Sequence, residues 1–236
     1  MFRTTLKKSA LAAVAIAAAA AALVPAAASA SIVTQSGGTL YVSGESFETN
    51  DMRVTLTNSY LEIYENNSGG VKPQVGTTCI QFSPGHARCN LLGVNFVRVN
   101  AADMHDRVVG DINSASYAFT MTGGTGNDML DVTGPTANRA FLYGEDGDDQ
   151  LFGRQFGDTV YGGNGADRIE TGGGTDSING GPGVDTINAG QDNDFIYAKD
   201  RTRDVITCGT GADWAQVDRI IGALLDRVSG CETLAK

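Results

Sequence analysis

An aspartate recurs at every ninth position through the C-terminal half of the chain, and this period constrains the fold more than any other feature. The series runs without a slip, and an aliphatic residue stands two positions after each aspartate. The aspartates are Asp149, Asp158, Asp167, Asp176, Asp185 and Asp194. The aliphatic residues are Leu151, Val160, Ile169, Ile178, Ile187 and Ile196. A short period in both a polar and an apolar position indicates a solenoid of stacked units.

The repeating unit is a nonapeptide of the form Gly-Gly-x-Gly-x-Asp-x-aliphatic-x. Blocks that begin at Gly123, Gly162 and Gly180 match it at every defined position. In the block AGQDNDFIY, Asp192 replaces the glycine of the fourth position. The block GRQFGDTVY fits worst, because Phe156 stands where that glycine is expected.

The period extends beyond the unbroken run in both directions. One extra residue after Tyr197 shifts the phase, and Asp204 and Asp213 then continue the series. On the N-terminal side the step from Asp128 to Asp149 exceeds two repeats by three positions, which indicates an eroded repeat with an insertion. The segment AADMHDRVV around Asp106 has the features of a worn repeat.

Each position of the nonapeptide has a physical role in the expected fold. Glycines at the first, second and fourth positions allow positive φ and a tight turn whose carbonyl groups can face an ion. The aspartate at the sixth position adds a charged oxygen ligand, and the aliphatic residue at the eighth fills the core from a strand of about three residues. The pattern predicts an all-β fold, a right-handed parallel β-roll or β-solenoid in which two nonapeptides make one coil.

Loops two repeats apart would then stack on the same edge of the roll, with ions between successive loops. One edge would contain Asp149, Asp167 and Asp185, and the other Asp158, Asp176 and Asp194. Calcium suits this arrangement because it accepts six to eight oxygen ligands in a flexible geometry, whereas magnesium requires a strict octahedron. We expect several Ca²⁺ ions, and we expect the repeats to be largely unfolded without them. The predicted metal ligands are Asp128, Asp149, Asp158, Asp167, Asp176, Asp185, Asp192, Asp194, Asp213, Gly163, Gly165, Gly172, Gly174, Gly181, Gly183 and Gly190.

The repeat run, roughly residues 123–216, resembles the haemolysin-type calcium-binding (RTX) proteins. In that family the sixth-position aspartates and the carbonyl groups of the glycine-rich turns hold each ion, which supports the ligand set above. The order of GTLYVSG, a region with two cysteines, the repeats, CGTGAD and DRVSGCE is similar to small secreted calcium-binding proteins of actinobacterial type.

The regions on either side of the repeats are predicted to be β-structure and caps. Residues 31–122 contain alternating runs such as RVTLTN and YLEIYE between turn-forming clusters, which predicts an irregular opening of the solenoid or a small β-cap. Residues 217–236 are expected to cap the other end, with a short helix or a closing strand between Ile220 and Leu234.

The first thirty residues have the features of a secretory signal peptide. Arg3, Lys7 and Lys8 precede an apolar run that ends near Val24, and Ala28-Ser29-Ala30 supplies small residues for cleavage. A membrane anchor is the alternative, but it would require a longer span that is richer in Leu and Ile. We therefore expect a secreted protein without a membrane span after cleavage.

The charge of the mature chain excludes one class of partner and favours another. Loss of Arg3, Lys7 and Lys8 leaves 14 cations against 27 acids, a formal net charge of −13. Nucleic acid is not an expected partner, because binding to phosphates requires clustered Lys and Arg. The acidic, glycine-rich composition favours cations, and cell-surface or matrix components are the other expected partners.

The four cysteines of the mature chain are expected to form disulfides in an exported protein. Nearest-neighbour pairing joins Cys79 to Cys89 and Cys208 to Cys231. A zinc site from Cys79, His86, Cys89 and His105 is the alternative, although its spacing matches no zinc pattern.

Two function classes remain open at this stage. The favoured one is a non-catalytic calcium-binding module with an adhesive, structural or buffering role, since the sequence contains neither an HExxH motif nor a GxSxG nucleophile elbow. The alternative is a calcium-dependent enzyme that acts on polysaccharide, with its site on the solenoid face or in residues 31–122.

Overall fold

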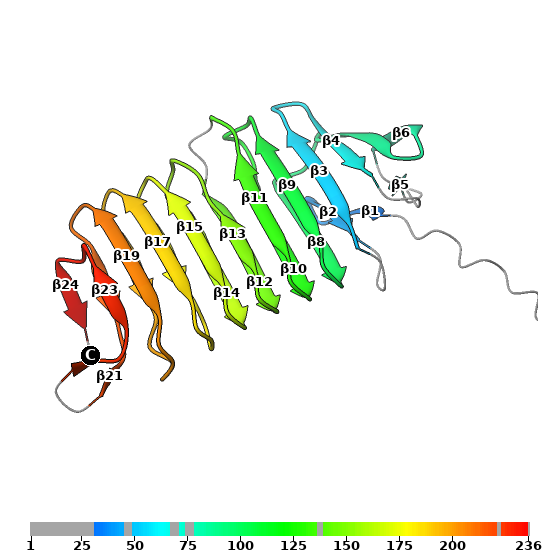
Figure 1. Ribbon diagram of the computed structural model, residues 1–236. Helices are drawn as coiled ribbons and strands as arrows, with labels where there is room; N and C mark the ends of the chain where they lie inside the picture. Colours follow the sequence, from blue (N-terminus) through cyan, green and yellow to red (C-terminus); the bar gives the residue numbers. More distant parts are fainter. Residues whose placement is uncertain are drawn as a thin grey trace, which may run out of the picture.

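The computed structural model describes residues 31–44, 49–66, 71–73, 78–135, 139–220 and 223–235. Every helix or strand within these ranges is a β-strand, which confirms the all-β prediction. Figure 1 shows the strands stacked side by side along one axis, from β2 and β3 near one end to β23 and β24 at the other. The predicted signal peptide lies outside the described residues, and within them no helix is long and apolar enough to cross a membrane.

Within the described ranges, two sheets of 11 strands form the solenoid, and a two-stranded sheet lies near its C-terminal end. The first sheet has the order β24 (Thr233–Ala235), β20 (Trp214–Gln216), β18 (Phe195–Tyr197), β16 (Ser177–Asn179), β14 (Thr159–Asn164), β12 (Ala140–Asp146), β10 (Ala118–Thr125), β8 (Phe96–Asp103), β2 (Thr39–Ser43), β1 (Ser31–Ser36) and β5 (Val71–Pro73). The second has the order β23 (Arg227–Ser229), β19 (Val205–Thr210), β17 (Thr186–Gln191), β15 (Arg168–Gly172), β13 (Gln150–Phe152), β11 (Met129–Thr133), β9 (Arg107–Ile112), β3 (Asp51–Leu56), β4 (Tyr60–Glu65), β7 (His86–Asn90) and β6 (Cys79–Ser83). The small sheet pairs β21 (Arg219–Ile220) with β22 (Ala223–Leu224).

The strand register confirms that two nonapeptides make one coil. Val160 of β14 pairs in parallel with Ile178 of β16, and Ile169 of β15 pairs with Ile187 of β17. The members of both pairs are two full repeats apart in the sequence. The next pair in the second sheet, Ile187 with Ile206, is one position farther apart, so the coil absorbs the inserted residue without losing its register.

The core is a column of eighth-position side chains between the two sheets. Leu151, Val160, Ile169, Ile178 and Ile196 are all completely buried. Their neighbours in each strand face outward, as two-residue alternation requires. A single buried aliphatic per nonapeptide is a thin core, so the roll depends on interactions at its edges as well.

The N-terminal region combines both alternatives that the sequence left open. Strands β8 and β9 already belong to the parallel stack, where they pair with β10 and β11. Before them, β1 pairs antiparallel with β2, and β3, β4, β7 and β6 form an antiparallel extension of the second sheet. This part closes one end of the core. At the other end β23 and β24 add the last parallel strands, so the closing-strand alternative holds within the described part of residues 220–234.

Two disulfides join the cysteines in nearest-neighbour pairs, as predicted. Cys79 and Cys89 are opposite each other on β6 and β7, and Cys208 of β19 is bonded to Cys231 before β24. Because all four sulfur atoms are in disulfides, the alternative zinc site loses its thiolate ligands.

Candidate metal centres along the edges of the roll

The sixth-position aspartates form buried ladders along both edges of the roll. Oδ1 of Asp167 accepts a hydrogen bond from the backbone N–H of Asp149 at 2.9 Å, and Oδ1 of Asp185 accepts one from Asp167 at 2.9 Å. On the other edge Oδ1 of Asp194 accepts the N–H of Asp176 at 2.9 Å. Each carboxylate therefore accepts a hydrogen bond from the backbone of the preceding coil. The backbone N–H of the same residue donates to the carboxylate of the next coil.

The second oxygen of most of these carboxylates is buried without a hydrogen-bond donor in the described part of the chain. The oxygens concerned are Oδ2 of Asp106, Asp128, Asp149, Asp167, Asp176, Asp185, Asp194, Asp204 and Asp213. Burial raises the pKa of Asp149 and Asp185 to about 7 and that of Asp167 to about 6. A buried carboxylate oxygen without a donor is costly, so these atoms require a cation or a proton.

On one edge these oxygens converge with backbone carbonyl groups on spaces that only glycine leaves open. A Cβ added to Gly162 would lie 2.2 Å from Oδ2 of Asp167 and 2.3 Å from the carbonyl oxygen of Gly180. At Gly144 it would lie 2.2 Å from Oδ2 of Asp149 and 2.3 Å from the carbonyl oxygen of Gly162. We call this edge, defined by Asp128, Asp149, Asp167 and Asp185, the glycine edge.

The donor set of the glycine edge fits calcium. The spaces at Gly144 and Gly162 are each approached by one charged carboxylate oxygen and one neutral carbonyl oxygen, a mixture that Ca²⁺ accepts. Among the described residues, no three Asp, Glu, His or Cys side chains gather closely enough to hold a metal ion by themselves. Backbone oxygens would therefore have to complete the coordination, which disfavours metals that prefer nitrogen or sulfur.

The glycines of the nonapeptide serve two different purposes. At the second and fourth positions Gly163 and Gly165 have φ of 118° and 132°, as predicted. At the first position the prediction of positive φ is wrong, because Gly144, Gly162 and Gly180 lie outside that region. Glycine is needed there for space, since a side chain would displace the carboxylate oxygen.

Comparison with known proteins identifies the repeats. A family model of the RTX calcium-binding nonapeptide repeat, with four copies, matches residues 141–160 and 161–196. These residues are RTX repeats. No curated protein and no solved structure matches the chain. RTX repeats bind calcium, so the family match and the oxygen geometry of the β-roll agree on the metal.

The second edge of the RTX β-roll has side chains where the glycine edge has spaces. We call it the substituted edge and define it by Asp158, Asp176, Asp194 and Asp213. The first position of the repeat along this edge is Gly153 in the first coil, and then Thr171, Ala189 and Cys208 in the coils that follow. A Cβ on Gly153 would lie 2.9 Å from Oδ2 of Asp158, so the carboxylate stands farther back than on the glycine edge.

Asp158 differs from the other ladder aspartates because a protein cation neutralises it. Oδ2 accepts the N–H of Arg154 at 2.9 Å, and the Arg154 guanidinium lies 3.8 Å from Oδ1. Both side chains are almost fully buried. The poorest block of the repeat, GRQFGDTVY, thus supplies its own positive charge beside the predicted ligand.

The carboxylate ladders contain more residues than the predicted ligand set. In line with the glycine edge, Asp106 accepts a hydrogen bond from the N–H of Asn50, and Asp204 accepts one from Asp185. Asp226 in turn accepts one from the N–H of Asp204. Glu232 accepts the N–H of Asp213 on the other side. Asp106 and Asp204 could be found from the period alone, whereas no repeat signal marks the last two.

The worn repeat around Asp106 keeps the backbone conformation of the nonapeptide without its glycines. Ala102 and Met104, at the second and fourth positions, have φ of 89° and 80°. Val108, two residues after Asp106, is completely buried. The interpretation of this segment as a repeat is therefore confirmed. Ala102 and Met104 adopt the positive φ that glycine adopts elsewhere in the repeats, a strained conformation for residues with a side chain.

Asp192 is the one predicted aspartate that lies outside the buried ladders. It is exposed, has φ of 73°, and accepts a hydrogen bond from the N–H of Gly174 at 3.1 Å through Oδ2. Its place as a calcium ligand stays a prediction.

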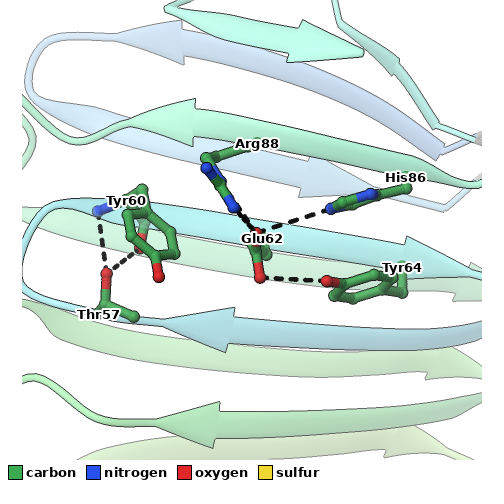
Figure 2. Close-up of polar contacts among 6 residues, drawn as sticks. All are labelled: Thr57, Tyr60, Glu62, Tyr64, His86 and Arg88. Atoms are coloured by element: carbon green, nitrogen blue, oxygen red, sulfur yellow. Dashed lines mark hydrogen bonds and ion pairs between the residues drawn. The ribbon is translucent and has the colours of Figure 1, made fainter. Parts of the chain in front are cut away.

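Both histidines described by the structure have contacts that stabilise the fold. His86 stacks on Tyr64 with ring centroids 4.3 Å apart and lies beside Glu62, as Figure 2 shows. Glu62 also accepts hydrogen bonds from Arg88 and Tyr64, and the bond from Arg88 lowers the pKa of Glu62. His105 accepts the N–H of Asn127 through Nδ1 at 2.7 Å.

Proposed function

We propose that the chain is an exported, non-catalytic calcium-binding β-roll with an adhesive or structural role outside the cell. The observation that carries the calcium part is the convergence of buried, donor-free carboxylate oxygens and glycine carbonyl groups along the glycine edge. The two disulfides and the leader-like N-terminus support export.

The glycine edge would hold the tighter ions. Asp128, Asp149, Asp167 and Asp185 supply the charged oxygens. The first-position glycines of the coils that follow the first three, Gly144, Gly162 and Gly180, supply carbonyl groups. A bound Ca²⁺ would neutralise the ladder and connect successive coils, which are otherwise held by main-chain hydrogen bonds and a thin core. The substituted edge would bind calcium more weakly, because a Cβ occupies the corresponding space at Thr171, Ala189 and Cys208.

Calcium binding and folding would then be coupled. With a dissociation constant of about 10⁻⁴ M and about 10⁻³ M Ca²⁺, each site contributes roughly 1.4 kcal/mol to stability. A few such sites approach the whole stability of an ordinary domain. Extracellular calcium would therefore switch the repeats from a largely unfolded chain to the roll.

The test is a calcium titration of the mature chain, residues 31–236, followed by circular dichroism and calorimetry, with Mg²⁺ as the control ion. At a pH above about 7, where the ladder aspartates are ionised, we expect β-structure to appear with calcium, to disappear with EDTA, and not to appear with Mg²⁺. Asp167→Ala and Asp185→Ala should each lose only a fraction of the bound ions. Equal β-structure in calcium and in EDTA would contradict the proposal.

The non-catalytic part is supported by the structural roles of the two histidines and is tested separately. Incubation with glycan and ester substrates, with and without calcium, should give no turnover. Calcium-dependent turnover of a polysaccharide would favour the enzyme alternative.

A further inference from the structure

The outer face of the first sheet carries a row of aromatic side chains that the calcium sites do not use. Tyr143 of β12 and Tyr161 of β14 are stacked with ring centroids 5.2 Å apart and planes 2° from parallel (Figure 1 locates the strands). Tyr197 of β18 meets Trp214 of β20 edge to face at 5.3 Å. The facing strands of the second sheet present charged residues such as Arg168 and Glu170 instead. The two faces of the roll therefore have different chemistry.

A groove of about 530 Å³ interrupts this row over β10. Its floor consists of small side chains, including Thr120 and Thr122. In the parallel register Thr120 lies between Arg98 of β8 and Phe141 of β12. Since adjacent strands are about 4.8 Å apart, the two walls stand roughly 9–10 Å apart across the floor. This is wide enough for a flat ring between the walls.

The lining of the groove combines aromatic rings with hydrogen-bonding groups. Phe96 and Tyr41 are 48% and 36% exposed, so their rings are available to a ligand. Arg98 and Glu145 add one positive and one negative charge, and the threonine hydroxyls add neutral donors and acceptors. The side chains that face outward into the groove include no branched aliphatic residue, so its apolar surface is mainly aromatic.

The groove is open and continues toward the glycine edge. A second hollow of about 380 Å³ shares Ser43, Asn100 and Glu145 with it and extends to Asp103 and Gly124. Those last two residues belong to the turns that precede Asp106 and Asp128. A ligand lying along β10 would thus be elongated, with one end beside turns that calcium is expected to order.

We propose that this groove, from Tyr41 and Phe96 to Tyr143 and Glu145, binds a neutral polysaccharide chain. Sugar rings present apolar C–H faces that stack on aromatic rings and hydroxyl edges that pair with Arg98, Glu145 and the threonines. The balanced charges of the lining favour an uncharged chain. The inference rests on the proposed surface role and names the class of partner, and it requires the folded roll.

The test measures binding of cellohexaose and chitohexaose to the mature chain by calorimetry in millimolar calcium, with sedimentation on insoluble cellulose and chitin. We expect saturable binding of at least one of these glycans. Phe96→Ala and Tyr143→Ala should each weaken it by about tenfold, the loss of one aromatic contact. Thr120→Tyr, which fills the floor from a partly exposed position, should abolish it.

Phe82→Ala is the matched control, because Phe82 is 56% exposed but lies on β6, away from the groove. Its binding should equal that of the parent chain, and circular dichroism in calcium should be unchanged in all four variants. Absence of binding to every glycan, tighter binding of the anionic chain alginate, or an equal loss in Phe82→Ala would overturn the proposal. If calcium-dependent folding persists while glycan binding is absent, only this inference fails.

Discussion

The two edges of the roll contain the same aspartate at the same position of the repeat, yet they differ at the residue five positions earlier. On the glycine edge Gly144 and Gly162 leave a space into which a carboxylate oxygen and a carbonyl oxygen point. On the substituted edge Thr171 and Ala189 place a Cβ there. We infer that the first position of the nonapeptide, rather than the aspartate, decides how well a cation fits.

A second difference concerns the source of positive charge. Donor-free oxygens occur on all four aspartates of the glycine edge, and on Asp176, Asp194 and Asp213 of the substituted edge. The substituted edge begins with Asp158, whose charge is opposed by the buried guanidinium of Arg154. One aspartate of the substituted edge, Asp158, therefore has a permanent counter-cation within the protein. The four aspartates of the glycine edge require an ion from solution to neutralise their charge.

The largest effect we expect is a loss of structure in the metal-free chain as pH rises. Burial raises the pKa of Asp149, Asp176 and Asp185 to about 7 in the folded state. In the unfolded chain the value is about 3.9, so the stabilisation is fully present below about pH 4 and is lost as pH rises through about 7.

Circular dichroism in EDTA between about pH 5 and pH 8 checks this, because an aspartate with an ordinary pKa of about 3.9 is already mostly ionised above about pH 5. Since Asp176 and Asp185 lie on different edges and have the same raised pKa, protons should act on both edges, while calcium should act mainly on the glycine edge. A metal-free chain that gains structure with rising pH would contradict the expectation.

The next effect concerns the built-in cation of the substituted edge. Arg154→Met should destabilise the roll by about 3 kcal/mol, because it leaves the charge of Asp158 buried without its partner. Denaturant unfolding in saturating calcium measures the change. Arg168→Met is the control, since Arg168 is largely exposed and should change stability by less than about 0.5 kcal/mol. If the two variants unfold alike, Arg154 is not the counter-charge of that edge.

A reciprocal exchange at the first position tests the comparison most directly. Gly162→Ala should cost about 2 kcal/mol through crowding of Asp167, and should remove one bound ion. Ala189→Gly, on the substituted edge, should cost roughly 1 kcal/mol from backbone entropy and should leave the number of ions equal or higher. Calorimetric stoichiometry separates the two. Equal stoichiometry in both variants and the parent chain would show that the first position does not govern binding.

The fold could be predicted from the sequence because the nine-residue period holds at two independent positions of the repeat. The aspartate and the aliphatic residue two places later fix the coil length, and the register of Val160 with Ile178 follows from it. The insertion after Tyr197 could be placed for the same reason. Cysteine pairing was also predictable, since each pair lies within one region of the chain.

The difference between the edges was not predictable from the motif. A consensus that requires glycine at the first position does not say whether glycine is needed for φ or for space, and the structure shows that space is the reason at Gly162. The terminal rungs at Asp226 and Glu232 were missed because they come from caps without the repeat. They become partners of the ladder only through the stacking of the last coil.

The smallest effect we expect is at Asp192, where the sequence predicts a ligand and the structure places an exposed turn residue. Asp192→Gly should relieve about 1 kcal/mol of left-handed backbone strain. It should also lose a weak hydrogen bond to Gly174 and some backbone entropy, so the net change should be within about 0.5 kcal/mol. Thermal unfolding in calcium measures this, and calorimetry counts the ions. Loss of an ion in Asp192→Gly would establish the carboxylate as a ligand and would restore to the substituted edge a site that its first-position side chains argue against.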